Sequence, residues 1–119
     1  MTSSMYNSIH HFNEFGVKKI EKAIKEFIKE GKDLGDLVFG GEESLFELGR
    51  NMLVEVLEDM DQHLRNSGLR KNNWEIVRND TTRLLTSFGM IKYNRTYFKP
   101  KKGGKRRYLV DDIVGVGPH

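Results

Sequence analysis

The spacing of apolar residues changes at Gly68 from the period of an α-helix to the period of a β-strand. From Phe15 to about Gly31, and again from about Glu42 to Asn66, apolar side chains recur every three or four residues. This is the stripe of an amphipathic helix. After Gly68, short runs of β-branched and aromatic residues alternate with glycine-bearing turns, which is typical of antiparallel strands. The order predicts an α+β fold.

The helical half is predicted to contain two helices, one of them long. Residues 1–13 are expected to form a poorly ordered lead-in to the first helix. Residues 31–44 are expected to form a break, because Gly35, Gly40 and Gly41 interrupt the helical pattern. The second helix, Glu42 to Asn66, has a broad apolar face that either the first helix or a second copy of the chain would cover.

The remaining half is predicted to form a small antiparallel β-meander of three or four strands. The expected strands are residues 74–78, 81–86, 90–98 and 106–110. Ser87-Phe88-Gly89 predicts a tight hairpin turn, and Pro100 to Gly104 a looser one. From Ile113 the chain runs into Gly115, Gly117 and Pro118, which predicts a linker-like tail.

Charge divides the chain in the same place as the apolar period. Residues 1–64 hold 7 Lys and Arg against 13 Asp and Glu, a net charge of −6, and residues 65–119 hold 13 against 4, a net charge of +9. We therefore expect an acidic helical region over residues 1–68 and a basic β-hairpin region over residues 69–119. The basic half suits an anionic partner, although the two halves could also neutralise each other.

Several classes of protein find no support in the sequence. The chain has no cysteine, which removes disulfides and thiolate metal sites. The N-terminus lacks the basic and apolar segments of a secretory signal, and no apolar run is long enough to span a membrane. No motif of an NTPase, an esterase or a zinc protease occurs. The expected location is the cytoplasm, without membrane contact.

The run from Lys99 to Arg107 is the sharpest candidate site. Six positive charges flank a flexible Gly-Gly turn. A cationic loop of this kind attracts phosphates and releases their counterions, but it does not read sequence. The alternative is a solvated hairpin tip. The cations of the run are Lys99, Lys101, Lys102, Lys105, Arg106 and Arg107.

The strand expected at residues 90–98 and its partner supply three further candidates for contact with nucleic acid. Strand alternation places Lys92 on one face and Arg95 on the other, between Tyr93 and Tyr97, and Arg83 lies on the partner strand. Arg and Tyr side by side can grip a backbone and stack on bases. The alternative, favoured for the tyrosines, is that they belong to the core with Arg95 at its margin.

Two acidic or imidazole pairs are weak candidates for metal ligation. Asp111 and Asp112 are expected on a strand, where adjacent side chains point to opposite faces and cannot converge on one ion. His10 and His11 lie in the expected lead-in without further ligands, whereas zinc needs four. We therefore predict no metal, no cofactor and no catalytic residue in this chain.

Three segments in this order resemble one family of mobile-element proteins. They are FELGRNMLVEVLEDMDQHL, WEIVRNDTTRLLTSFGMIKYNRTYF and RRYLVDDIVGVGPH. With the hairpin pattern TSFG-x-I-x-Y-x-R-x-Y and the Y-L-x-D segment, residues 40–119 look like the N-terminal region of ISLre-type bacterial insertion-sequence transposases. Proteins of this type are often described only as an uncharacterised family.

The resemblance implies an accessory region that binds transposon ends or assembles subunits. In such transposases a downstream RNase H-like domain carries three acidic residues that bind two divalent metals, and none of the three maps onto this chain. The expected function is therefore a non-catalytic DNA-binding and assembly region with low sequence specificity. The alternatives are a dimerisation module acting through the 42–66 helix, or an inactive truncated remnant of a mobile element.

Overall fold

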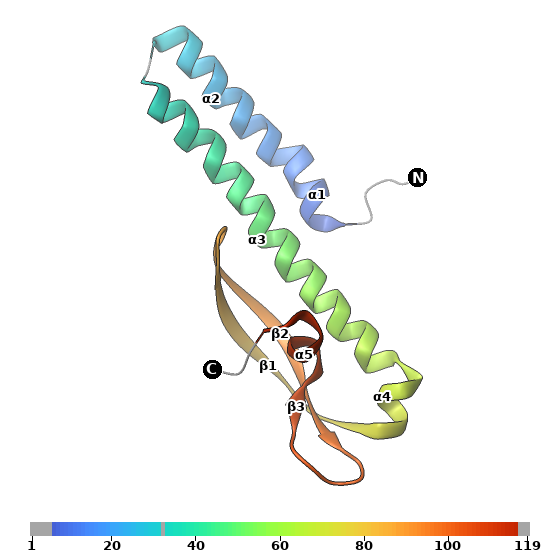
Figure 1. Ribbon diagram of the computed structural model, residues 1–119. Helices are drawn as coiled ribbons and strands as arrows, with labels where there is room; N and C mark the ends of the chain where they lie inside the picture. The colour runs from blue at the N-terminus through green and yellow to red at the C-terminus, as the bar shows by residue number, and fades with distance from the viewer. Residues whose placement is uncertain (1–5, 32, 117–119) are drawn as a thin grey trace. The chain divides into compact units, whose positions relative to one another are not determined.

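The computed structural model describes residues 6–31 and 33–116, which form two compact units (Figure 1). The first unit comprises residues 1–55 with 85–91, and the second comprises residues 56–84 with 92–119. The predicted division at residue 68 is one of composition and charge, and it stays a prediction. The elements in chain order are α1 (Asn7–His11), the π-helical turn η1 (Phe12–Gly16), α2 (Val17–Glu30), α3 (Leu34–Asn66), α4 (Gly68–Asn73), β1 (Trp74–Thr86), β2 (Gly89–Pro100), β3 (Arg107–Tyr108) and α5 (Leu109–Val114).

The described part of the first unit begins with helical turns where a poorly ordered lead-in was expected. Residues 7–16 form α1 and η1 and lead directly into α2, so the expectation for residues 1–13 is wrong over this part. Residues 1–5 lie outside the described residues. The predicted end of the helix at Gly31 is confirmed, because Gly31 adopts the left-handed conformation (φ 62°) and its N–H donates to the Phe27 carbonyl at 3.1 Å.

Helix α3 begins eight residues before the predicted Glu42, so the break expected over residues 31–44 is wrong from Leu34 onward, while Gly31 and Asp33 lie outside the two helices. The glycines that indicated a break lie inside the helix. Gly40 faces α2, and a Cβ at Gly40 would lie 3.0 Å from the Cβ of Ala23. The missing side chain lets the two helices of this unit pack side by side (Figure 1), and that packing overrides the low helix propensity of glycine.

The β1–β2 turn packs against α3 within the first unit. The turn at Ser87 and Phe88 is the predicted one. The Phe88 ring lies on Gly49, where a Cβ would come within 2.5 Å of the ring. Arg50 Nη1 donates to the Phe88 carbonyl at 2.8 Å. Glycine is therefore required at position 49, because any side chain there would clash with the Phe88 ring.

The sheet has the order β1-β2-β3 and is antiparallel, which confirms the α+β class. The strands expected at residues 74–78 and 81–86 are one continuous strand. Across the expected gap, Arg78 Nε donates to the Asp80 carboxylate at 2.9 Å. The strand expected at residues 106–110 is reduced to Arg107–Tyr108 and followed by α5. The expected tail from Ile113 is wrong for Ile113 and Val114, because both lie in α5, which Gly115 caps in the left-handed conformation (φ 81°). Residues 117–119 lie outside the described residues.

The core of the second unit lies between α3, the sheet and α5. Tyr93, Phe98 and Val110 are almost completely buried. Asp61 of α3 is also buried and accepts hydrogen bonds from the Thr96 N–H (2.9 Å) and the Thr96 hydroxyl (2.6 Å). A buried carboxylate of this kind docks the strand on the helix while satisfying its own hydrogen-bonding capacity.

Candidate nucleic-acid interface

The basic loop, residues 99–107, connects β2 to β3 and is anchored at its base. The Lys101 N–H donates to the Asn73 carbonyl at 2.9 Å, and the Lys101 ammonium donates to the Lys71 carbonyl at the end of α4. On the other side, β3 pairs with β2 through Tyr97 opposite Tyr108. The tip turns through Gly103 (φ 88°) and Gly104 (φ 123°), a conformation that glycine adopts without strain. The predicted looser turn is therefore confirmed.

All six cations of the basic loop are exposed. Lys101 is engaged at the loop base, and Arg107 faces Asp112 with 3.7 Å between Nη1 and Oδ2. This ion pair is solvent-exposed and contributes little to stability. The side chains of the remaining four make no hydrogen bond or ion pair with any described residue; they are Lys99, Lys102, Lys105 and Arg106.

Arg83 and Lys92 are exposed on β1 and β2. They lie on the strand faces that carry Thr81 and Asn94, whose side chains share a hydrogen bond of 2.7 Å. Both cations belong to the second unit, as does the basic loop. Contact of these residues with nucleic acid stays a prediction.

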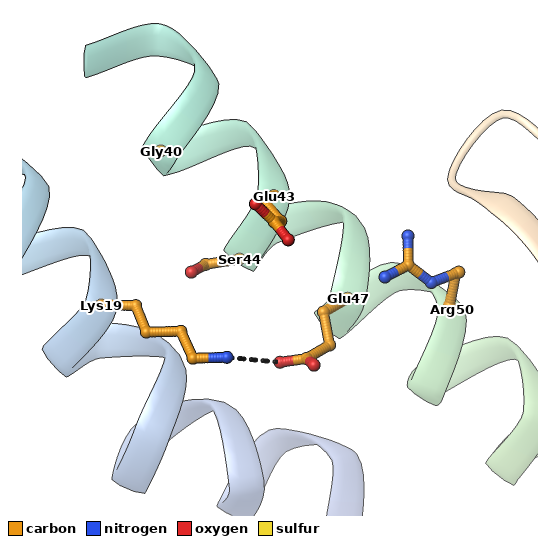
Figure 2. A pocket seen from close by; sticks show the side chains of 6 residues that line it. All are labelled: Lys19, Gly40, Glu43, Ser44, Glu47 and Arg50. Carbon is orange, nitrogen blue, oxygen red and sulfur yellow. Dashed lines mark ion pairs between the residues drawn. The ribbon is translucent and has the colours of Figure 1, made fainter. Parts of the chain in front are cut away.

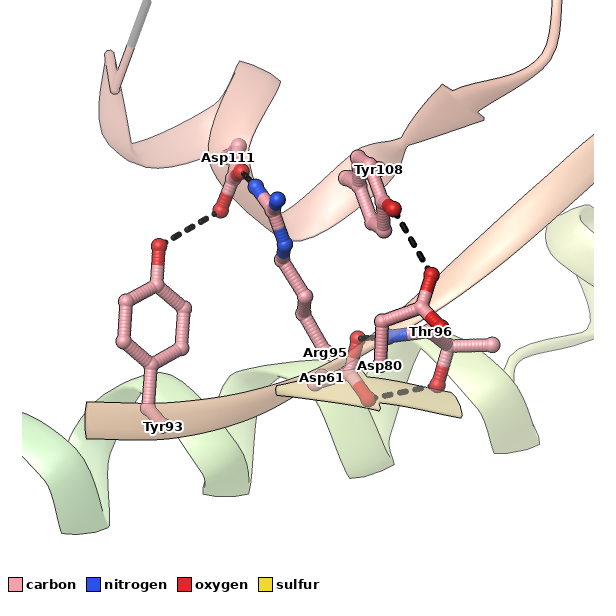
Figure 3. Close-up of polar contacts among 7 residues, drawn as sticks. All are labelled: Asp61, Asp80, Tyr93, Arg95, Thr96, Tyr108 and Asp111. Carbon is pink, nitrogen blue, oxygen red and sulfur yellow. Dashed lines mark hydrogen bonds and ion pairs between the residues drawn. The ribbon is translucent and has the colours of Figure 1, made fainter. Parts of the chain in front are cut away.

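Arg95 lies inside the fold and not on an open surface (Figure 3). Its guanidinium pairs with the buried Asp111 and lies 3.6 Å from the centre of the Tyr108 ring. Tyr93 donates to the other oxygen of Asp111 at 2.9 Å. Arg95 therefore neutralises a buried carboxylate, and its charge is occupied within the fold, as the core alternative predicted for this strand.

The same polar cluster shifts the ionisation of its tyrosines. Burial and the hydrogen bond to Asp111 raise the pKa of Tyr93 to about 12. Burial and the hydrogen bond to Asp80, 2.7 Å long, also raise the pKa of Tyr108. The hydrogen bond from Tyr108, together with Arg78, lowers the pKa of Asp80. All three shifts move the pKa further from neutrality, as expected for groups whose hydrogen bonds help to hold the fold together.

The role of Asp111 in this cluster was not indicated by the sequence. Asp111 and Asp112 were expected on a strand, but they lie in the first turn of α5. Their carboxylates still diverge, since Asp111 contacts Tyr93 and Arg95 while Asp112 faces Arg107. The spacing of 16 residues between Arg95 and Asp111 carries no local signal of an ion pair.

His10 and His11 belong to α1 and not to a lead-in. His10 lies 2.9 Å from Glu14, and His11 lies 3.6 Å from Glu47. Within residues 6–31 and 33–116, no three His, Asp or Glu side chains gather in an arrangement that could hold a metal ion.

A polar pocket of about 330 Å³ lies between α2 and α3 in the first unit (Figure 2). Lys19 approaches Glu47 to 3.8 Å across it. Glu43 and Arg50 add one charge of each sign, and the buried Ser44 lies in its wall. Because its charges balance, the pocket offers no excess charge to attract an anionic or cationic ligand.

Comparison with known proteins places the chain in a family. The family model of the uncharacterised protein family UPF0236 matches residues 27–119. The chain belongs to the UPF0236 family. Two UPF0236 proteins of Caldanaerobacter subterraneus subsp. tengcongensis are each 32% identical to it over 102 residues, which is 86% of this chain and 22% of theirs. The chain thus spans about a fifth of the length of these relatives. No solved structure matches it.

The matched family and its relatives carry the name UPF0236 alone, so the resemblance to transposases stays a prediction. The name of one relative joins eleven designations of the same series, and the name of another from the same strain joins four. In the described part of this chain, no helix is both long and apolar enough to cross a membrane.

Proposed function

We propose that this chain is a non-catalytic DNA-binding and assembly region of a DDE-type transposase. The observation that carries the proposal is the basic loop, in which Lys99, Lys102, Lys105 and Arg106 are exposed and have no partner among the described residues. Arg83 and Lys92 extend the cationic surface along the hairpin. Arg95 is left out of the contact set because Asp111 already pairs with it.

The geometry of the loop supports contact with phosphates and not with base edges. Its base is fixed by Lys101 on α4 and by the Tyr97–Tyr108 pair, while the Gly-Gly tip gives the cations freedom to follow a phosphate backbone. Binding of this kind gains free energy from counterion release and carries little sequence information. The second unit holds 13 Lys and Arg against 7 Asp and Glu, a net charge of +6, which draws the whole unit towards a polyanion.

Two further observations support a mobile element. The hairpin and Y-L-x-D segments resemble the N-terminal region of ISLre-type transposases. A relative whose name joins eleven designations of the same series is what repeated copying of an element would produce. In this proposal the catalytic acids and their divalent metals belong to a separate RNase H-like domain, and the protein works in the cytoplasm, where bacterial DNA is accessible.

A fluorescence-anisotropy titration against duplex DNA tests the proposal. The loop variant replaces Lys99, Lys102, Lys105 and Arg106 with Ala, which leaves every hydrogen bond and ion pair of the described fold intact. The matched control removes the same amount of charge from α2, by replacing Lys18, Lys22, Lys25 and Lys29 with Ala. We expect the loop variant to bind at least about tenfold more weakly and the control to bind nearly as the parent does. Equal loss in both variants would contradict a specific role of the loop.

Self-association through the 42–66 segment of α3 is a second candidate function. Leu45, Met52 and Val56 are exposed on this helix at 51%, 39% and 42%. Apolar side chains of this size in one helical segment favour a protein partner. Replacing Leu45 and Met52 with Glu would convert a helix-mediated dimer to monomer in sedimentation experiments. A chain that neither binds DNA nor self-associates would fit an inactive remnant of a mobile element.

A further inference from the structure

Strand β1 has one edge that no other strand among the described residues covers. The sheet order β1-β2-β3 places β1 on the outside, and β1 is 13 residues long. Residues 75–79 are all exposed. Apart from the bonds within the sheet itself, none of the backbone hydrogen bonds between described residues involves residues 75–85. This edge therefore carries a row of unpaired N–H and C=O groups, which is a template for strand pairing.

The other edge of β2, which faces away from β1, is protected by side chains of α3, whereas the outer edge of β1 is not. The β2 backbone before Tyr97 has no partner in the short β3, but the Asn94 N–H donates to Glu58 at 2.8 Å and the Thr96 N–H donates to Asp61 at 2.9 Å. Pro and charged side chains, Lys above all, are among the features that protect edge strands. The stretch from Trp74 to Thr86 contains neither Pro nor Lys, and its four charged residues carry both signs: Glu75, Arg78, Asp80 and Arg83.

The pairing with β2 determines which backbone groups of β1 point outward. The two-residue turn places Thr86 opposite Gly89 and Thr81 opposite Asn94, whose side chains are in contact. Because the Asn94 N–H is bonded to Glu58, Thr81 and Asn94 do not exchange backbone hydrogen bonds. Antiparallel alternation then turns the backbone groups of odd-numbered residues, from Glu75 to Arg83, away from β2.

The sequence of this edge is complementary to itself about Asn79. When two copies of β1 run antiparallel and cross at Asn79, Glu75 of each lies opposite Arg83 of the other, and Arg78 lies opposite Asp80. Opposite charges directly across a strand pair stabilise it. A centre at Asn79 also allows the backbone hydrogen bonds to form, because the backbone groups of odd-numbered residues, Asn79 among them, face outward.

We propose that β1 pairs with β1 of a second copy of this chain, antiparallel and centred on Asn79. The pairing joins two sheets into one continuous sheet about a two-fold axis, with the same surface used by both copies. It uses a surface distinct from the 42–66 segment of α3, and it does not depend on DNA binding.

Site-specific crosslinking tests the register, because the chain has no cysteine of its own. In this dimer the two Asn79 Cα atoms are about 5.5 Å apart, within the range of a disulfide. The two Val77 Cα atoms are roughly 13 Å apart, since Val77 faces Thr81 of the other copy. We expect Asn79→Cys to form a disulfide-linked dimer on mild oxidation at least about tenfold faster than Val77→Cys, and the double variant Val77→Cys/Thr81→Cys to crosslink as well. Equal rates for the two single variants would overturn the register.

Charge exchange tests the pairing without any covalent bond. Glu75→Arg places two arginines opposite each other, and Arg83→Glu places two glutamates opposite each other. Each single change should raise the dissociation constant in sedimentation equilibrium by about tenfold, and the double change should restore it, because both side chains are exposed and the fold does not depend on them. Asn79→Pro should give a monomer, because it removes an outward N–H. A parent chain that is monomeric up to its solubility limit, or an Asn79→Pro chain that still dimerises, would overturn the proposal.

Discussion

Asp61 on α3 holds Thr96 on β2 through both polar groups of the threonine, its backbone N–H at 2.9 Å and its hydroxyl at 2.6 Å. Both residues are buried, at 4% and 0% exposure. The carboxylate performs for β2 what a neighbouring strand would perform, because β3 is too short to reach this position. This contact therefore decides how the sheet that carries the basic loop is supported.

Replacing Asp61 tests the importance of this support. Asp61→Ala leaves the Thr96 N–H and hydroxyl buried without an acceptor, which should lower the free energy of unfolding by about 2–4 kcal/mol. Asp61→Asn retains one carbonyl oxygen and should cost less than Asp61→Ala. Urea denaturation followed by circular dichroism measures both. A loss below about 0.5 kcal/mol for Asp61→Ala would show that water or another group replaces the carboxylate.

The α+β class was predictable from the sequence because periodicity reports which face of an element is buried. The start of α3 was not, since Gly35, Gly40 and Gly41 indicate a break until Ala23 is known to pack against Gly40. The extent of β1 was missed for a related reason: Asn79 and Asp80 are typical turn residues, yet Asp80 is held on the strand by Arg78 and Tyr108. In both cases contacts between distant segments override local preference.

The candidate site was predictable only where it depends on local sequence. A run of like charges around a Gly-Gly turn is a local signal, and its cations are exposed as expected. The role of Arg95 depends on Asp111, which lies 16 residues away on a helix that the sequence pattern did not predict. No local pattern distinguishes an arginine that will meet phosphate from one that will meet a buried carboxylate.

Tyr93 makes the second unit sensitive to alkali. Its pKa is raised from 10.0 to about 12, so the neutral form is favoured in the folded state. This contribution to stability is complete below pH 10 and is lost as the pH rises from 10 towards 12. Denaturation midpoints across this range should fall with pH, and tyrosinate absorbance should show late-titrating groups, because the pKa values of both Tyr93 and Tyr108 are raised. Tyr93→Phe should show a shallower fall; an unchanged slope in this variant would assign the effect to other groups.

Glu55 makes the docking of α1 sensitive to acid. Burial alone would raise the pKa of Glu55, but the hydrogen bonds from the Ser8 hydroxyl and from the Ser8 and Asn7 N–H groups outweigh burial and lower it from 4.5. The contribution of Glu55 is therefore present above pH 4.5 and is lost as the pH falls through its lowered folded-state pKa.

Hydrogen exchange of the α1 amides measures this effect. Protection at Ser8 should fall in that acid range in the parent chain. In Glu55→Gln it should be weaker at neutral pH and lack the acid step. An acid step of the same size in Glu55→Gln would mean that a different carboxylate controls the docking.

The salt dependence of DNA binding tests the central claim most directly, because it counts the phosphates that the protein neutralises. The logarithm of the binding constant should fall linearly with the logarithm of salt concentration, by about 0.9 for each phosphate contact. Replacing Lys99, Lys102, Lys105 and Arg106 with Ala should reduce that slope by up to about 3–4, whereas replacing Lys18, Lys22, Lys25 and Lys29 with Ala should leave it unchanged. An equal slope in the parent chain and the loop variant would contradict phosphate contact by the basic loop.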